Sequence, residues 1–409
     1  MINNEISPKK KFGILTKLMN NQKFSSIANL IENGATIEDP EQKSNVLNTY
    51  FSNKSTVLNP EDCVPDLEER PNTTQFSTIN TSPIEVSKII RSLKKSNFSH
   101  CGVPGKFLSL IATPISFSLS KLFNNHFQTG IFPDIWKVSH VTAIYKSKGL
   151  KSDKNNYRPI SLLPSLSKIC ESIIHKRLHD HCTENNIITN RQAAYLKGDS
   201  TVSQLLYIIH KIRSQWTKGN ITHGIFLDVQ AAFDKVWHKG LLAKLSQINI
   251  IEKVHDLFSS YLSNRQQIVV VDGCKSEIKP VMAGVPQGSR LGPLLFIIYI
   301  NDITTNIESD ILIFADDTSL LANGKSPEIT SEILNRDLAK IEHWSNTWKV
   351  TFNADKSKQI IFSNKTYNFS PLIKLNNKTV KKVDTHKHLG IHLTYNLDWS
   401  VQIYNVCLS

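Results

Sequence analysis

The sequence predicts an α+β fold, in which helices are combined with a sheet that contains hairpins. Segment 82–93 has apolar residues at helical spacing behind a Ser-Pro start, which suits a capped helix. Two extended runs, 265–271 and a second one that ends at Met282, flank an Asp-Gly pair at 272–273. Asp-Gly is typical of a tight hairpin turn, and hairpins join antiparallel strands. These observations together favour helices on an antiparallel sheet.

The other elements follow from the same two periodicities. Helical spacing predicts helices at 44–51, 104–127, 165–181, 200–214, 231–245 and 328–349, with one more from Pro293 onward. Alternating or continuous apolar runs predict strands at 138–145, at 223–228 and on both sides of Asp316-Asp317. Residues 1–25 are polar and basic, so we expect them outside the core. Residues 59–82 are rich in Pro, Asn, Thr and Ser, and we interpret them as a linker.

Composition narrows the class of protein. The chain has 409 residues, which suits two or three domains, and its formal net charge is +13. That surplus favours a polyanionic partner, although a solvated basic surface would give the same number. Six scattered cysteines without a CxxC pair argue against a disulfide framework or a zinc ribbon. Since neither a membrane-spanning run nor a secretory signal is present, we expect an intracellular, non-secreted protein without a membrane partner, in nucleus or cytoplasm.

Adjacent carboxylates are the most informative feature of the chain. Asp316 and Asp317 stand between two strongly apolar runs, where a strand–turn–strand unit would place them at the edge of a core. Two such charges repel each other unless a cation neutralises them, and oxygen ligands suit Mg²⁺. A plain surface turn is the alternative. Asp228 ends a buried strand, where it either caps the following helix or supplies a third ligand facing the Asp pair.

Two loops add groups that bind anions. Residues 283–293 hold three glycines and two prolines before an apolar helix, a pattern that allows close approach of the backbone to a ligand. A structural turn before a core helix is the alternative. Residues 146–149 and 155–160 carry Lys and Arg side chains that suit a triphosphate, although most loop cations are only solvated.

The order of these segments resembles the reverse transcriptase of non-LTR (LINE-type) retrotransposons, most of all the jockey-like group. The resemblance covers residues 26–405. The matching runs are Asn156–Pro164, Phe226–Asp228 with Ala232–His238, Gly284–Ser289, Leu291–Phe296, Tyr299–Asp302, Phe314–Asp317, Asn353–Lys358 and His388–Ile391. Each run is moderately specific, whereas the ordered set is very specific.

The resemblance implies an RNA-directed DNA polymerase. Asp228, Asp316 and Asp317 resemble the metal-binding carboxylates of the polymerase palm, with Asp317 the more peripheral. They would hold two Mg²⁺ ions, with Mn²⁺ as a substitute, and the primer 3′-OH would attack the α-phosphate of a dNTP. Lys356 resembles the lysine near the phosphates, a candidate acid for the leaving pyrophosphate, although a solvated lysine is the alternative. RNA template, DNA primer and dNTPs are the expected partners.

Nucleotide-binding roles are implied for five further residues. Lys146 and Arg158 look like the fingers residues that bind the incoming triphosphate. Gln287 with Gly288 looks like the contact to the new base pair and template. Phe233 looks like the bulky gate that excludes a ribose 2′-OH, and a core phenylalanine is the alternative.

The resemblance also implies a right-hand polymerase with an antiparallel palm sheet and an N-terminal helical extension. The expected divisions are an extension and linker at 1–82, fingers at 83–222, a palm at 223–370 that includes a fingers hairpin at 265–283, and a partial thumb at 371–409. We expect other domains of the element protein to be missing from this chain.

Some residues depart from the family pattern. Phe314 replaces the usual tyrosine two residues before the Asp pair, and we expect activity to survive the loss of that hydroxyl. Ala194, Leu196 and Asp199 replace a glycine and two arginines near the template. Fewer cations would weaken template binding. A catalytically inactive, nucleic-acid-binding remnant is therefore the competing hypothesis.

Overall fold

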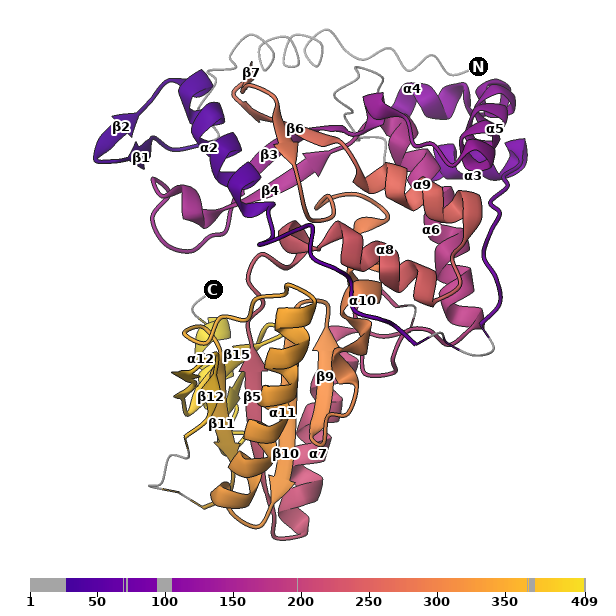
Figure 1. Ribbon diagram of the computed structural model, residues 1–409. Coiled ribbons are helices and arrows are strands. Elements are labelled where there is room, and N and C mark those ends of the chain that lie inside the picture. The colour runs from indigo at the N-terminus through magenta and orange to yellow at the C-terminus, as the bar shows by residue number, and fades with distance from the viewer. Residues whose placement is uncertain are drawn as a thin grey trace, which may run out of the picture.

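The computed structural model of the chain describes residues 27–407, except 69, 71–72, 94–104, 197, 366 and 368–371 (Figure 1). The segment 1–25, expected outside the core, lies outside the described residues. Helices and strands are mixed, in agreement with the predicted α+β class. The described helices are α2 (Pro40–Lys54), α3 (Pro83–Ser92), α4 (Gly105–Leu110), α5 (Ala112–Thr129), α6 (Ser165–Glu184), α7 (Thr201–Thr217), α8 (His238–Gln247), α9 (Glu252–Leu262), α10 (Gly292–Ile300), α11 (Pro327–Thr347) and α12 (Ser400–Cys407).

Two five-stranded sheets organise the molecule. The first sheet has the order β14-β11-β5-β10-β9, and the second has β4-β3-β6-β7 with β8 also on β6. The first contains β5 (Ile221–Leu227), β9 (Asp310–Phe314), β10 (Asp317–Gly324), β11 (Lys358–Phe362) and β14 (Lys381–Lys382). The second contains β3 (Val138–Tyr145), β4 (Tyr157–Leu162), β6 (Arg265–Val271), β7 (Cys274–Lys275) and β8 (Lys279–Val281). Outside them lie three pairs: β1 (Leu30–Glu32) with β2 (Ala35–Ile37), β12 (Lys374–Leu375) with β13 (Lys378–Thr379), and β15 (Thr385–His388) with β16 (Ile391–Thr394).

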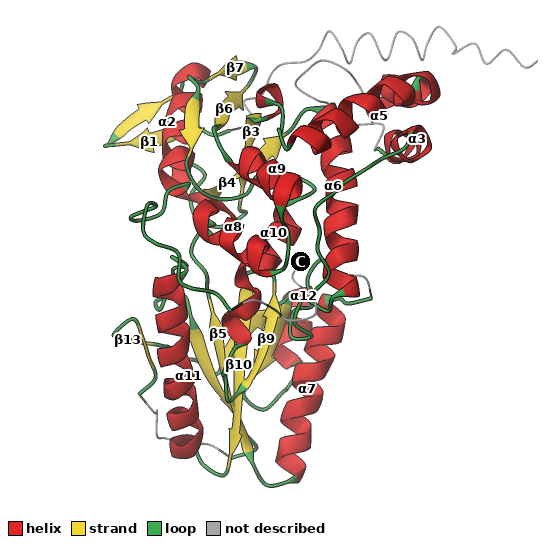
Figure 2. Ribbon diagram, turned by 45° about the vertical axis from the view of Figure 1, so that its right-hand side comes forward, coloured by secondary structure: helices red, strands yellow, loops and turns green. Residues whose placement is uncertain are grey.

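The first sheet is covered on both faces. Figure 2 shows α11 and α7 on opposite sides of its strands. Successive residues of β5 point to opposite faces, so Ile225 packs in one cluster with Leu338 of α11, while Phe226 packs in another with Ile208 of α7. Strands β9, β10, β5 and β11 pair antiparallel, whereas β14 joins β11 in parallel. The sheet is therefore mixed rather than wholly antiparallel.

The second sheet is covered by α2. Leu47 and Phe51 of this helix are buried against Val141 and Val269 of the sheet. Within this sheet β3 and β4 form an antiparallel hairpin, and β6 pairs in parallel with β3. The predicted hairpin after Val271 is present, although the returning chain is divided into β7 and β8. None of the helices that the structure describes has both the length and the apolar character needed to cross a bilayer.

Two predicted elements are wrong. The single helix at 231–245 is instead a 3-10 turn, η3 (Ala232–Lys235), followed by α8. Ala231 adopts a left-handed backbone with φ of 50°, and the Phe233 carbonyl accepts a hydrogen bond from the N–H of Val285. In a continuous helix the Phe233 carbonyl would accept from an N–H of the next turn. Here it accepts from Val285 of a distant loop, and the helix is interrupted. Segment 59–82 is not a free linker, since Phe76 and Ile79 are buried in the main core.

One glutamine fixes the hairpin between β9 and β10. Gln192 lies beside this hairpin, and the Arg191 carbonyl accepts from the N–H of Ile313. The Gln192 side-chain Oε1 accepts from the N–H of Ala194 at 2.8 Å and from the N–H of Ala315 at 3.1 Å. The turn that carries Asp316 is therefore anchored by a buried amide from another segment.

This anchor predicts a difference between two buried glutamines. Gln192→Leu removes both hydrogen bonds, so we expect a loss of about 2 kcal/mol in the free energy of unfolding, because two backbone N–H groups lose their acceptor. Gln204 is also buried, but within the described residues its amide has no hydrogen-bond partner. Gln204→Leu should therefore be neutral or stabilising. Urea unfolding of both variants checks this, and equal losses would contradict the assigned role of Gln192.

Candidate active site

Three aspartates meet at one end of the first sheet. Asp228 directly follows β5, whose Leu227 lies opposite Thr318 of β10. Asp317 begins β10, and Asp316 lies in the tight turn that joins β9 to β10. The antiparallel register therefore brings the end of β5 next to the turn, as expected from the sequence.

Burial raises the pKa of all three carboxyl groups, and repulsion from neighbouring carboxylates adds to it at Asp316 and Asp317. Burial raises the pKa of Asp317 to about 6, helped by the charges of Asp316 and Asp228. Burial and the charge of Asp228 also raise the pKa of Asp316. For Asp228, burial raises the pKa while Lys356 lowers it, and the Lys356 Nζ lies 3.9 Å from Asp228 Oδ2. The sheet end thus concentrates negative charge that the protein itself neutralises only partly.

The three carboxylates are suitable ligands for a divalent cation, but their side chains are not arranged as a metal-binding group. An all-oxygen donor set of like charge suits a hard cation such as Mg²⁺. Among the described residues, however, no group of three or more His, Cys, Asp or Glu side chains is arranged to hold a metal ion. The three aspartates therefore share an edge and an electrostatic field, without a finished coordination shell.

A basic cluster faces this edge. Lys146 follows β3 and Arg158 lies in β4, so one hairpin of the second sheet carries both. Lys146 Nζ donates to the Asn155 carbonyl at 2.7 Å, which fixes its side chain. Burial lowers the pKa of Lys146, followed by the charges of Arg158 and Lys356, and Arg158 in turn lowers the pKa of Asp316. The cations of the hairpin and the carboxylates of the sheet therefore act on each other.

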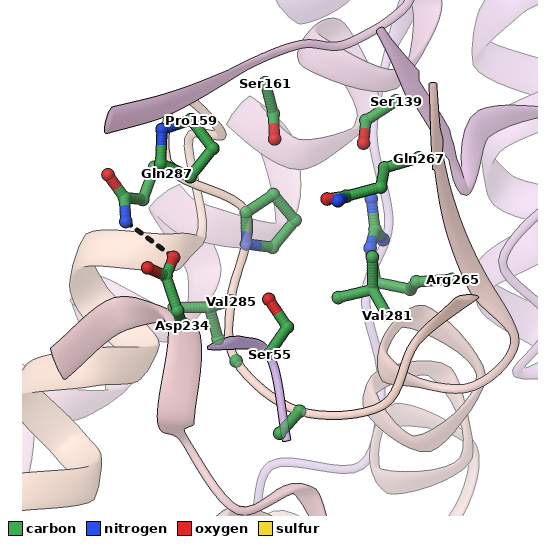
Figure 3. A pocket seen from close by; sticks show the side chains of 13 residues that line it. Ser55, Ser139, Pro159, Ser161, Asp234, Arg265, Gln267, Val281, Val285 and Gln287 are labelled. Carbon is green, nitrogen blue, oxygen red and sulfur yellow. Dashed lines mark hydrogen bonds between the residues drawn. The ribbon is translucent and has the colours of Figure 1, made fainter. Parts of the chain in front are cut away.

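Residues 284–288 (Gly-Val-Pro-Gln-Gly), named the Gly-Pro-Gln-Gly loop here, are bonded to β4 and to Asp234. Gln287 donates from Nε2 to Asp234 Oδ1 at 2.6 Å, and its carbonyl accepts from the Ser161 N–H at 2.7 Å (Figure 3). Gly288 has φ of 111°, and a Cβ there would lie 2.7 Å from the Ser161 carbonyl oxygen. Glycine is thus required because the loop backbone touches β4. A nucleotide contact by Gln287 or Gly288 stays a prediction.

Phe233 packs on the core side of the site. Its ring is half-buried and stacks on Phe296 of α10, with 4.6 Å between ring centroids and 24° between planes. The core alternative for this residue therefore has direct support, and its role as a gate stays a prediction.

Sequence reasoning missed two residues near the site. Burial raises the pKa of Asp234, which Gln287 and the charges of Lys54 and Lys146 counteract. Asp234 lies in the Ala232–His238 motif next to Phe233, and this position in the motif could have indicated a role near the site. Lys54 ends helix α2, and nothing in its local sequence marks it, because only the tertiary fold brings it to the loop.

Comparison with known proteins shows which family the chain resembles in sequence. Residues 146–393 match the family model described as reverse transcriptase (RNA-dependent DNA polymerase). The chain is 36% identical to the RNA-directed DNA polymerase from mobile element jockey of Drosophila melanogaster, over 70% of this chain and 32% of that protein. It is 28% identical to the probable RNA-directed DNA polymerase from transposon BS of the same species, over 93% of this chain and 44% of that protein.

A third relative is the probable RNA-directed DNA polymerase from transposon X-element, also of Drosophila melanogaster. It is 28% identical over 79% of this chain and 36% of that protein. The matches thus cover between 32% and 44% of the length of these three relatives. Since the family model covers more than half of the chain, the chain belongs to the reverse transcriptase (RNA-dependent DNA polymerase) family.

Proposed function

We propose that this chain carries RNA-templated DNA synthesis for a non-LTR retrotransposon, extending a primer 3′-OH with dNTPs. The observation that supports it best is electrostatic. Asp228, Asp316 and Asp317 gather at one sheet end, and Lys146 and Arg158 face them from the hairpin of the second sheet. A nucleoside triphosphate with divalent cations complements both charges at once.

In this proposal the two sheets correspond to parts of a right-hand polymerase. Most of the first sheet belongs to a palm at 223–370, which its strand β14 extends past residue 370, and the second sheet belongs to fingers at 83–222 together with the hairpin 265–283. Pairing of β6 with β3 supports this grouping, because the hairpin shares a sheet with the basic strands. Residues 1–82 form an N-terminal extension, and 371–409 begin a thumb.

The carboxylates and the cations would divide the chemistry between them. Asp228 and Asp316 would hold two Mg²⁺ ions, or Mn²⁺ in their place, with Asp317 more peripheral. When bound, these ions activate the primer hydroxyl and neutralise the charge that develops on the phosphates. Lys146 and Arg158 would orient the triphosphate, and Lys356 would protonate the leaving pyrophosphate from its place beside Asp228.

Two residues would read the nucleotide itself. Phe233 would exclude a ribose 2′-OH, supported by the rigid stacking of its ring on Phe296. Gln287 would contact the new base pair, supported by the backbone bond that fixes its loop to Ser161 of β4. Since the Gln287 side chain is held by Asp234, a contact through its backbone fits this arrangement best.

The partners are an RNA template, a DNA primer and dNTPs, and we propose an intracellular setting with other domains of the element protein. The net charge of +13 suits this set. An inactive remnant is less well supported. Ala194 is buried and its N–H donates to Gln192, so this departure from the family pattern is compatible with the local fold.

Primer extension on an RNA template with Mg²⁺ tests the proposal. Asp316→Ala should lower the extension rate roughly a thousandfold, because it removes a carboxylate that would hold the cations on which the reaction depends. Asp256→Ala is the control, since Asp256 is an exposed carboxylate on α9 that pairs with Lys253. Folding and RNA binding of both variants should match the wild type. Absence of extension by the wild-type chain with RNA binding intact would support the remnant instead.

Thermal stability should depend on pH and metal through Asp317. A folded-state pKa raised to about 6 means that ionisation of this group costs stability as pH rises from the unfolded value of 3.8 to 6. Asp317→Asn should therefore stabilise the metal-free protein at pH 8 by about 1 kcal/mol, after allowance for solvent screening, because the Asp317 carboxylate is only partly withdrawn from water. At pH 4 the gain should largely vanish.

Added Mg²⁺ should narrow this difference, because it stabilises the wild type more than the variant. Differential scanning fluorimetry at both pH values, with and without Mg²⁺, measures the effect. A variant that is less stable than the wild type at pH 8 without metal would contradict the assigned repulsion.

A further inference from the structure

Helix α2 ends beside the small pocket that Asp234 and Gln287 line. Its backbone is fixed on the second sheet, because Asn48 Nδ2 donates to Ser276 Oγ at 2.8 Å and Asn48 Oδ1 accepts from Gln267 Nε2 at 2.9 Å. Ser55, directly after the helix, lines the same small pocket as Asp234 and Gln287 (Figure 3). The last turn of α2 is thus positioned rigidly beside the Gly-Pro-Gln-Gly loop.

The side chain that ends this helix is a lysine in a strongly cationic setting. Lys54 is half-buried, and its Nζ lies 4.1 Å from the centroid of the Tyr50 ring. Burial lowers its pKa to about 8, and the charges of Lys146, Lys356 and Lys235 lower it further, against Asp234, which raises it. Within the described residues no salt bridge joins Lys54 to a carboxylate.

The lysines around Lys54 are close enough to repel one another. Lys54, Lys146 and Lys356 come from three separate segments and act on one another. The carboxylate that raises the pKa of Lys54 is Asp234, and it already accepts a hydrogen bond from Gln287. Lys356 lies 3.9 Å from Asp228 Oδ2, whereas within the described residues neither Lys54 nor Lys146 forms a salt bridge with a carboxylate. These two cations repel each other unless an anionic ligand binds between them, and a stack of phosphates is such a ligand.

We propose that Lys54 of helix α2 is a further ligand of the triphosphate of the incoming dNTP, so that the N-terminal extension contributes directly to nucleotide binding. This inference rests on the proposed function. A triphosphate is favoured over the template backbone because Lys54 and Lys146 act on each other, and Arg158 of the same hairpin as Lys146 acts on Asp316.

Two measurements on the full chain test the proposal. One is the dNTP KM in primer extension, and the other is the affinity of the chain with template–primer for a fluorescent dATP analogue. Lys54→Gln should raise KM and the analogue Kd roughly tenfold, as expected for loss of one charge-assisted contact, with the loss falling on KM more than on kcat. Lys54→Arg should restore most of the affinity. Lys121→Gln, an exposed lysine on α5, is the matched control.

The outcomes separate this inference from the proposed function. If the wild type extends a primer and Lys54→Gln binds dNTP as tightly as the wild type, the role of Lys54 is overturned. The proposed polymerase function is then unaffected. Weaker RNA binding with unchanged dNTP affinity overturns it also, in favour of a template contact. If the wild type neither binds the analogue nor extends a primer, both the proposed function and the inference fail. Failure of Lys54→Arg to recover affinity would indicate a packing role instead.

Discussion

Repulsion between three carboxylates at one sheet end is the constraint on which the rest of this structure depends. Burial raises the pKa of Asp228, Asp316 and Asp317, the charge of Asp228 raises the pKa of the other two further, and Lys356 is the cation beside Asp228. Such an arrangement costs stability in the free protein. It is useful where a ligand brings positive charge, and this is why a cation-dependent reaction on a polyanionic substrate explains it best.

Distant segments hold that unfavourable arrangement in place. Gln192 anchors the turn of the β9–β10 hairpin with its side-chain oxygen. The Gly-Pro-Gln-Gly loop is bonded to β4 through Ser161 and to the Phe233 carbonyl through Val285. The buried Glu171 of α6 accepts from the N–H of Arg290 just before α10. Each of these bonds joins parts far apart in sequence, so the site depends on the tertiary fold and not on any one segment.

Local patterns in the sequence predicted the parts of the site that depend on local structure. The position of Asp316 at a strand–turn–strand unit follows from its apolar flanks, and the end of β5 follows from a buried run. The helix expected after Asp228 was wrong because periodicity does not report the left-handed Ala231. The proposed role of Lys54 could not be predicted for a related reason, since no local pattern shows which loop the end of a helix will contact.

Anomalous diffraction from Mn²⁺ tests the central claim most directly. In crystals of the chain with template–primer and a non-reactive dNTP analogue, we predict Mn²⁺ peaks at bonding distance from carboxylate oxygens of Asp228 and Asp316. Those peaks should lie between the sheet end and the analogue's phosphates. Nucleotide bound at the site without a peak there, or Mn²⁺ bound only elsewhere on the chain, would contradict the claim that this edge holds the catalytic cations.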